Sequence, residues 1–339
     1  MRRKRLTAIS SHIETLKPES RPQMHALSDL EIQKPEPIVN KSDDMQQLGP
    51  KLLRHCFKVI APYFWGPKHQ DIWSIGRFIT KIIGKSTIDA KCRDGSWLCF
   101  PLPVYTMYFL HGVDLKKYGV GNLTPIFRKN ISSGTVAIDV GASCGQEIIE
   151  LSKAVGEDGI VYAFEPSTSF LALTRTVALN GLQNVICVNA GCGNENGYID
   201  EDKEQAYVIG ESIKYAEKGT PIVRIDDFLE LIGEERPVSL IKIDTDGFEL
   251  EVVQGAKKRI SSSETTVIAE FEKHFNYSGY QAQDVLKKYA DLGFSIEKLQ
   301  TMSTVVSETE FDNYLSDIDD PANMIAHDIV LRPTQSSQR

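Results

Sequence analysis

The sequence contains no stretch of the kind that carries a chain into or across a membrane. No run reaches the ~18 consecutive apolar residues expected of a membrane-spanning helix. The basic start MRRKR leads into polar residues and not into the apolar core of a signal peptide. We therefore expect a cytoplasmic protein with no membrane span. The basic cluster could instead be a nuclear or anionic-surface tag, although charged termini of this kind are usually just solvated.

Two further absences concern zinc and nucleic acid. The six cysteines include no Cys-x-x-Cys pair, so the sequence shows no structural zinc motif and predicts reduced, mostly buried thiols. Acidic residues outnumber basic ones, giving a formal charge of −8 at pH 7, whereas nucleic-acid-binding proteins usually present a basic face. The Asn-Pro-Pro-Tyr element of base-flipping enzymes is also missing. We expect no nucleic-acid partner.

The chain has 339 residues, 41% of them hydrophobic, which is enough for one large domain with a substantial core and an accessory region. Residues 1–50 are polar and proline-containing without a sustained period, and we expect a flexible or loosely docked arm. Residues 51–130 predict a cap: one or two amphipathic helices broken at Gly66-Pro67, then a β-hairpin. The hairpin should turn at Asp94-Gly95, a pair suited to a two-residue turn.

Residues 131–333 alternate between strand-like and helix-like segments. Such alternation predicts a parallel sheet covered by helices, an α/β domain. Asp226 or Asp227 is expected to cap one of the helices. The predicted strands lie at 135–140, 159–165, 184–191, 221–225, 239–245, 266–272, 295–300 and 324–332, and the predicted helices at 146–155, 169–181, 227–232, 249–260 and 282–293.

The turn after the first of these strands reads VAIDVGASCG and predicts a ligand site. Gly141 lets the turn tighten and Gly145 lets the backbone approach a ligand, while Asp139 can orient the loop or meet a cationic group. The Gly-x-x-x-Gly spacing differs from the Gly-x-Gly-x-x-Gly of pyrophosphate binders, so a ligand without phosphates fits better. Glu165 ends the next strand, where a carboxylate can accept both ribose hydroxyls. Otherwise it is a surface acid capping the following helix.

A second group of acids follows two later strands. Asp244 and Asp246 end a strongly apolar strand, and Glu270, Glu272 and His274 end the next one. Carboxylates crowded at one edge of a sheet repel one another unless they are used, which indicates an active-site rim. Asp246 alone could instead cap the following helix. Asp244, Asp246 and Glu270 are also weak candidates to bind Mg²⁺, which we rank below a metal-free site.

Five segments in order carry a resemblance to one family: AIDVGASCG, YAFEPS, VRIDDFL, IKIDTDGFELEVVQGA and IAEFE. Together they resemble the FkbM family of S-adenosylmethionine-dependent methyltransferases, closely over 131–273 and more loosely from 87 to 331. The resemblance implies a class I methyltransferase (Rossmann-like) fold, with a seven-stranded sheet whose last strand is antiparallel, preceded by the helical and β-hairpin extension.

The resemblance also implies roles for particular residues. Asp244 falls in the family's Lys-Ile-Asp-x-Glu-Gly motif, where Asp246 replaces Glu and shortens the side chain by one methylene. At the adenine, Asn189 stands where related enzymes often carry an acid. The cofactor residues carried over are Asp139, Gly141, Ala142 and Gly145 beside the methionine part, Glu165 and Pro166 at the ribose, and Asn189 and Ala190 at the adenine edge.

These residues predict methyl transfer from S-adenosylmethionine to a hydroxyl of a sugar, glycan or other small molecule. Such a reaction requires alignment and a base for the hydroxyl proton, and Asp244 or His274 is the expected base. A nicotinamide-dependent oxidoreductase on a similar sheet is one alternative, opposed by the missing Gly-x-Gly-x-x-Gly. A non-catalytic binding protein that retains the fold is another. The sequence leaves the acceptor and the oligomeric state open.

Overall fold

A computed structural model describes nine ranges of the chain. The predicted helices between residues 51 and 84, and both Glu272 and His274, lie outside them. The described ranges are 26–42, 86–102, 123–199, 215–216, 219–263, 265–271, 279–299, 306–311 and 328–334.

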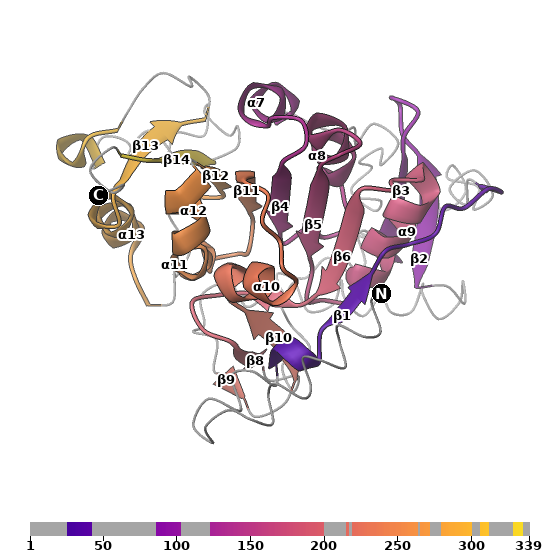
Figure 1. The fold of residues 1–339 in the computed structure, drawn as a ribbon, viewed down its shortest axis with the longest axis horizontal. Coiled ribbons are helices and arrows are strands. Elements are labelled where there is room, and N and C mark those ends of the chain that lie inside the picture. The colour runs from indigo at the N-terminus through magenta and orange to yellow at the C-terminus, as the bar shows by residue number, and fades with distance from the viewer. Residues whose placement is uncertain are drawn as a thin grey trace, which may run out of the picture.

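A mostly parallel sheet of eight strands forms the centre of the protein, in the order β1-β6-β5-β4-β11-β12-β14-β13 (Figure 1). Without β1, its seven strands follow the order 3-2-1-4-5-7-6, and the last strand is antiparallel to both neighbours. The implied class I methyltransferase sheet is confirmed. Its strands are β4 (Val136–Val140), β5 (Ile160–Phe164), β6 (Val185–Asn189), β11 (Val238–Ile243), β12 (Thr266–Ala269), β13 (Phe294–Lys298) and β14 (Ile329–Pro333).

Helices cover both faces of the sheet. Successive strand residues point to opposite faces, so Ala137 packs with one group of helices and Ile138 with the other. On the Ala137 side lie α7 (Thr124–Asn130), α8 (Ile148–Val155) and α9 (Phe170–Asn180). On the Ile138 side lie α10 (Ile225–Leu231), α11 (Glu249–Gly255), α12 (Lys257–Ser263) and α13 (Ala282–Asp291). Among the described residues, no helix is both long and apolar enough to cross a bilayer.

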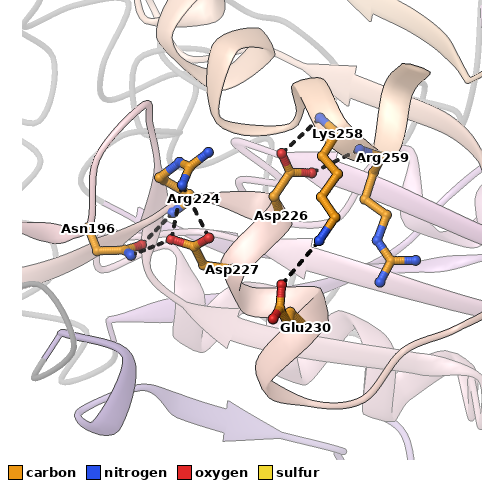
Figure 2. Close-up of polar contacts among 7 residues, drawn as sticks. All are labelled: Asn196, Arg224, Asp226, Asp227, Glu230, Lys258 and Arg259. Atoms are coloured by element: carbon orange, nitrogen blue, oxygen red, sulfur yellow. Dashed lines mark hydrogen bonds and ion pairs between the residues drawn. The ribbon is translucent and has the colours of Figure 1, made fainter. Parts of the chain in front are cut away.

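The single helix predicted over 249–260 is divided into α11 and α12. At Gly255 the chain passes so close to Gly193 that a Cβ would lie 1.9 Å from the Gly193 carbonyl oxygen. A carboxylate from α10 supports the new start, because Asp226 accepts hydrogen bonds from the backbone N–H groups of Lys258 and Arg259, both at 2.9 Å (Figure 2).

The predicted capping of the helix at 227–232 by Asp226 or Asp227 is wrong. This helix, α10, begins earlier, after Arg224, and no side chain caps it. Asp226 instead accepts hydrogen bonds from the first turn of α12. Asp227 accepts a hydrogen bond from the Asn196 amide at 2.7 Å and pairs with the Arg224 guanidinium (Figure 2). Both acids therefore connect separate elements.

The strand predicted at 221–225 exists as β10 (Thr220–Val223) but does not belong to the central sheet. It pairs in parallel with β7 (Gly191–Cys192) and antiparallel with β8 (Gly197–Ile199), and β9 (Tyr215–Ala216) completes this small sheet. Periodicity identifies a strand but not its partners, which is why the sequence did not distinguish the two sheets.

Part of the expected arm is docked onto the central sheet. Residues Glu31–Gln33 form β1, antiparallel to the outer strand β6, where the sequence predicts no strand. Leu27 is buried in the core, and the Ile38 N–H donates to the carbonyl of Ala178 on α9 at 2.9 Å. The strand forms because β6 would otherwise present unpaired backbone groups at the sheet edge.

The predicted hairpin is present as β2 (Thr87–Lys91) and β3 (Trp97–Pro101). Its turn is one residue longer than expected, because the Cys92 N–H bonds to the Ser96 carbonyl and encloses three residues, of which Gly95 has a φ of +89°. The hairpin packs on α9, where Arg175 pairs with the buried Asp89. Five cysteines lie in the described ranges, and all are buried thiols: Cys92, Cys99, Cys144, Cys187 and Cys192.

Candidate active site

Strand alternation brings the predicted acids to one face of the sheet at its carboxyl edge. Leu240 of β11 and Ile268 of β12 belong to the apolar cluster under α7, α8 and α9. Residues two positions further along each strand share that face. Lys242 and Glu270 therefore point to the same side as Asp139 of β4, whose Cα is the register partner of Lys242.

A buried lysine, Lys242, lies between two of the predicted acids. Its Nζ is 3.0 Å from Oδ2 of Asp244 and 3.6 Å from Oδ1 of Asp139. Burial alone would lower the pKa of Lys242, but the two carboxylates raise it well above its usual range, so the ammonium stays charged. Our sequence prediction did not include this residue. The signal was a lysine inside the apolar strand, two positions before Asp244.

Asp139 is fully buried, and its charge is only partly balanced. Neither of its carboxylate oxygens accepts a hydrogen bond from any residue that the structure describes, and Lys242 stands just beyond hydrogen-bonding distance. Burial raises the pKa of Asp139 to about 7 despite the nearby ammonium. A buried polar group without a partner is costly, so this carboxyl is suited to a ligand that supplies a donor or positive charge.

Glu165 holds the glycine turn in place. One carboxylate oxygen accepts the backbone N–H of Ser143 and the other that of Ser167, both at 2.8 Å. The side chain is buried, which raises its pKa, so the alternative of a surface acid is wrong. Each oxygen has a second lone pair, leaving capacity to accept hydroxyl donors as well.

The two glycines of the turn make different close contacts. Gly141, at φ +77°, lies against the backbone of Asp244: a Cβ here would be 1.8 Å from the Asp244 carbonyl oxygen. Gly145, at φ +85°, faces α9, where a Cβ would lie 3.1 Å from Leu173 and 3.3 Å from Thr176. The first glycine thus joins the turn to the acidic loop, and the second lets α9 pack closely. Approach of a ligand to Gly145 stays a prediction.

Asp244 and Glu270 form a carboxyl pair. Burial and then the Asp244 carboxylate raise the pKa of Glu270 well above its usual range, which favours a protonated Glu270 as a hydrogen-bond donor to Asp244. Burial opposes the ionisation of Asp244, but Lys242 and this hydrogen bond lower its pKa overall. At neutral pH Asp244 is consequently a hydrogen-bond acceptor held between a neutral acid and a cation.

Glu249 shapes the loop that carries Asp244 and Asp246. One of its carboxylate oxygens accepts the N–H groups of Thr245, at 2.9 Å, and Gly247, at 3.3 Å. Asp246 adopts a left-handed φ of +54°, and burial followed by repulsion from Asp244 raises its pKa to about 6. No side chain caps α11, so the alternative role of Asp246 as its cap is wrong.

The Mg²⁺ candidates Asp244, Asp246 and Glu270 are neighbours in this cluster. Within the described residues, no three or more His, Cys, Asp and Glu side chains are placed to hold a metal ion. His274, the second expected base, cannot be placed beside them because it lies outside those residues.

The remaining predicted cofactor residues lie along the same edge. The N–H groups of Gly141 and Ala142 both donate to the Phe164 carbonyl at 3.0 Å, which brings the turn against the end of β5, just before Glu165 and Pro166. Asn189 ends β6 and is followed by the buried Ala190. Strands β6, β5 and β4 are adjacent, so the predicted adenine, ribose and methionine residues follow one another along the edge.

Comparison with known proteins adds a family match. Residues 139–296 match the methyltransferase FkbM domain. No curated protein matches the chain. A methyltransferase FkbM from Methylobacillus flagellatus KT is similar in structure, with a TM-score of 0.35 and 15% identity over 57% of this chain and 49% of that one. This chain therefore spans about half the length of that FkbM protein.

Two further solved structures have TM-scores and sequence identities close to these values. A SAM-dependent O-methyltransferase from Thermotoga maritima has a TM-score of 0.38 and 13% identity over 76% of this chain and 81% of its own. An rRNA methylase from Streptococcus thermophilus has a TM-score of 0.34 and 10% identity over 62% and 94%. The FkbM domain match covers residues 139–296, which is slightly less than half of this chain.

Proposed function

We propose that this chain is a cytoplasmic S-adenosylmethionine-dependent methyltransferase that methylates a hydroxyl oxygen of a sugar, glycan or small molecule. The observation that carries the proposal is the buried Asp139 carboxyl without a hydrogen-bond partner among the described residues, beside a turn fixed by Glu165. S-adenosylmethionine carries a sulfonium and an ammonium group. Both groups are positively charged, and they suit a site in which several carboxyl groups surround a single lysine, Lys242.

The cofactor would extend along the carboxyl edge from β4 to β6. Asp139, with Gly141, Ala142 and Gly145 around it, would face the methionine part, and the second lone pairs of the Glu165 oxygens would accept the ribose hydroxyls. Asn189 and Ala190 would meet the adenine. The hydrogen bonds that already hold Glu165 would reduce the conformational entropy lost on binding.

When bound, S-adenosylmethionine would supply an activated methyl group on sulfur. Asp244 would accept a hydrogen bond from the acceptor hydroxyl and orient its oxygen, because its lowered pKa keeps it ionised. A carboxylate of this kind takes the proton only as the hydroxyl loses it in the transition state. His274 is the alternative base, because an imidazole is in general better matched to neutral pH than a carboxylate.

Titration calorimetry with S-adenosylmethionine and S-adenosylhomocysteine tests the proposal. We expect binding of both, and weaker binding by Asp139→Asn, which keeps the size of the side chain but removes the charge. Absence of binding to wild type would reject the proposal, and NADH fluorescence enhancement on mixing would then favour the oxidoreductase.

The acceptor class is tested separately by following S-adenosylhomocysteine release with a panel of sugars, glycans and small alcohols. An RNA sample belongs in the panel, since a structurally similar protein is an rRNA methylase. Methylation of RNA alone would overturn the small-molecule assignment while leaving the methyltransferase. Full activity in excess chelator would show that no divalent metal is required.

A further inference from the structure

A residue outside the matched FkbM domain contacts the expected adenine site. Glu31 of β1 is directly opposite Asn189 of β6 in the antiparallel register, and residues in this relationship project to the same face. The Asn189 amide nitrogen donates to the Glu31 carboxylate at 3.3 Å. The N-terminal strand therefore reaches the end of β6 with a charged acceptor.

This contact determines which way the Asn189 amide points. An ionised carboxylate can only accept, so the amide must turn its NH₂ group toward Glu31 and its oxygen away. That oxygen, Oδ1, is buried and accepts no hydrogen bond from the described residues. The other Glu31 oxygen accepts from the Gln33 side chain at 2.6 Å, which holds the carboxylate in position. The result is a fixed acceptor without a partner.

The segment that carries Glu31 is attached at several points. Leu27 is buried and Ile32 packs against the main core. Asp29 accepts the hydroxyl of Tyr198 at 2.7 Å, beyond the Asn189 contact, and Ile38 bonds to α9 on the other side. Glu31 is thus held in register with Asn189 from both directions along the chain.

We propose that Glu31 is a positioning residue that sets the base specificity of the cofactor site, by directing the Asn189 oxygen toward the 6-amino group of adenine. This inference rests on the proposed function. An adenine 6-amino group donates to such an oxygen, whereas the 6-oxo group of hypoxanthine would oppose one acceptor to another. Leaving a buried acceptor unpaired costs about 1–3 kcal/mol, which corresponds to roughly 5- to 150-fold in affinity.

The test compares S-adenosylhomocysteine with S-inosylhomocysteine by titration calorimetry. Wild type should bind S-adenosylhomocysteine at least about tenfold more tightly than S-inosylhomocysteine. In Glu31→Lys the new ammonium can only donate, so it attracts the Asn189 oxygen and turns the NH₂ group toward the base; the preference should then disappear or reverse. A glutamine at position 31 can pair with the Asn189 amide in either orientation. Glu31→Gln should therefore give an affinity ratio between those of wild type and Glu31→Lys.

Two controls separate positioning from general damage. Glu36→Lys makes the same charge change at an exposed place on the same segment and should keep the wild-type ratio. In an Asn189→Ala background, Glu31→Lys should no longer change the ratio, because Glu31 acts through that amide. Thermal denaturation establishes that each variant is folded.

The outcomes distinguish this inference from the proposed function. If wild type binds neither ligand, the proposed function fails and the inference with it. If wild type prefers adenine but folded Glu31→Lys and Glu31→Gln keep the same ratio, the role of Glu31 is wrong and the methyltransferase proposal stands. If Glu31→Lys changed the affinity ratio equally in the wild-type and Asn189→Ala backgrounds, the proposed role of Glu31 would also be wrong.

Discussion

Gly141 lies directly against the carbonyl group of Asp244, so close that a Cβ at position 141 would be 1.8 Å from that oxygen. The glycine turn after β4 and the acidic loop after β11 are therefore in contact through their backbones. The Asp244 N–H also donates to the Val140 carbonyl at 3.0 Å, which extends the pairing of the two strands up to the glycine. The expected cofactor turn and the expected catalytic acid cannot shift independently.

We expect Gly141→Ala to lower the free energy of unfolding by roughly 2–5 kcal/mol, since it combines a strained positive φ with a clash against backbone. Gly95→Ala is a matched control: it has a similar φ of +89° but nothing within 4 Å of the new methyl group. Chemical denaturation of both variants measures the difference. Equal losses would show that the contact with Asp244 contributes nothing.

The strand pattern of the sequence predicted most of the central sheet. Runs such as VAIDV and VYAF have the apolar residues that strands buried on both faces require, and these strands are present. Strand β1 was missed because Glu31–Gln33 is short and polar, and pairs only because β6 offers an edge. The placement of β10 in a second sheet likewise depends on contacts that no local pattern encodes.

The candidate site was predicted unevenly. Period-two alternation and the parallel order of strands explain why Asp139, Asp244 and Glu270 come together. The sequence could not show that Glu270 would hold a proton, because its raised pKa depends on burial and on the facing Asp244. Lys242 was missed for the same reason: a lysine in an apolar strand becomes informative only once the acids around it are placed.

Lys242→Met should destabilise the protein strongly. Removing one partner of a buried ion pair typically costs about 3–5 kcal/mol, and here the buried carboxyl of Asp139 would lose its cation. The partly exposed carboxyl of Asp244 would lose its cation as well. Lys258→Met provides the control, because its ammonium pairs with Glu230 at 3.3 Å where both side chains are 72% exposed. Such surface pairs contribute about 0–1 kcal/mol. Similar losses in the two variants, measured by urea denaturation, would contradict a central role for Lys242.

The raised pKa of Glu249 predicts a pH dependence of stability. Burial raises it from 4.5 to about 7, so between these values the folded state binds more protons than the unfolded state. The stabilisation is fully present below pH 4.5 and is lost as pH rises toward 7. We expect Glu249→Gln, which keeps an acceptor for the Thr245 N–H, to flatten this slope.

Denaturation curves between pH 4 and 8 measure this effect. Glu230→Gln, a change at an exposed carboxyl, should leave the slope as in wild type. A Glu249→Gln slope indistinguishable from wild type would show that Glu249 ionises as readily in the folded as in the unfolded chain. Because the pKa of Asp139 is also raised to about 7, part of the pH dependence should remain in Glu249→Gln.

Glu165→Gln should weaken binding of S-adenosylhomocysteine by about 10- to 100-fold, the affinity equivalent of one unpaired buried polar group. The carboxylate accepts N–H groups with both oxygens, whereas glutamine has one acceptor and would set its NH₂ against the N–H of Ser143 or Ser167. One of the two hydrogen bonds that Glu165 accepts, from Ser143 or from Ser167, would be lost. The ribose would lose one of its two hydrogen-bond acceptors.

Glu234→Gln separates this loss from a general decrease in stability. Glu234 is also buried and also accepts two kinds of donor, the Tyr162 hydroxyl at 2.7 Å and the Arg236 guanidinium, but it precedes β11, away from the carboxyl edge. Its substitution should lower the unfolding temperature without changing affinity. Calorimetry well below both unfolding temperatures decides the matter: unchanged affinity in folded Glu165→Gln would place the nucleoside elsewhere, since the proposed position depends on both oxygens of this carboxylate.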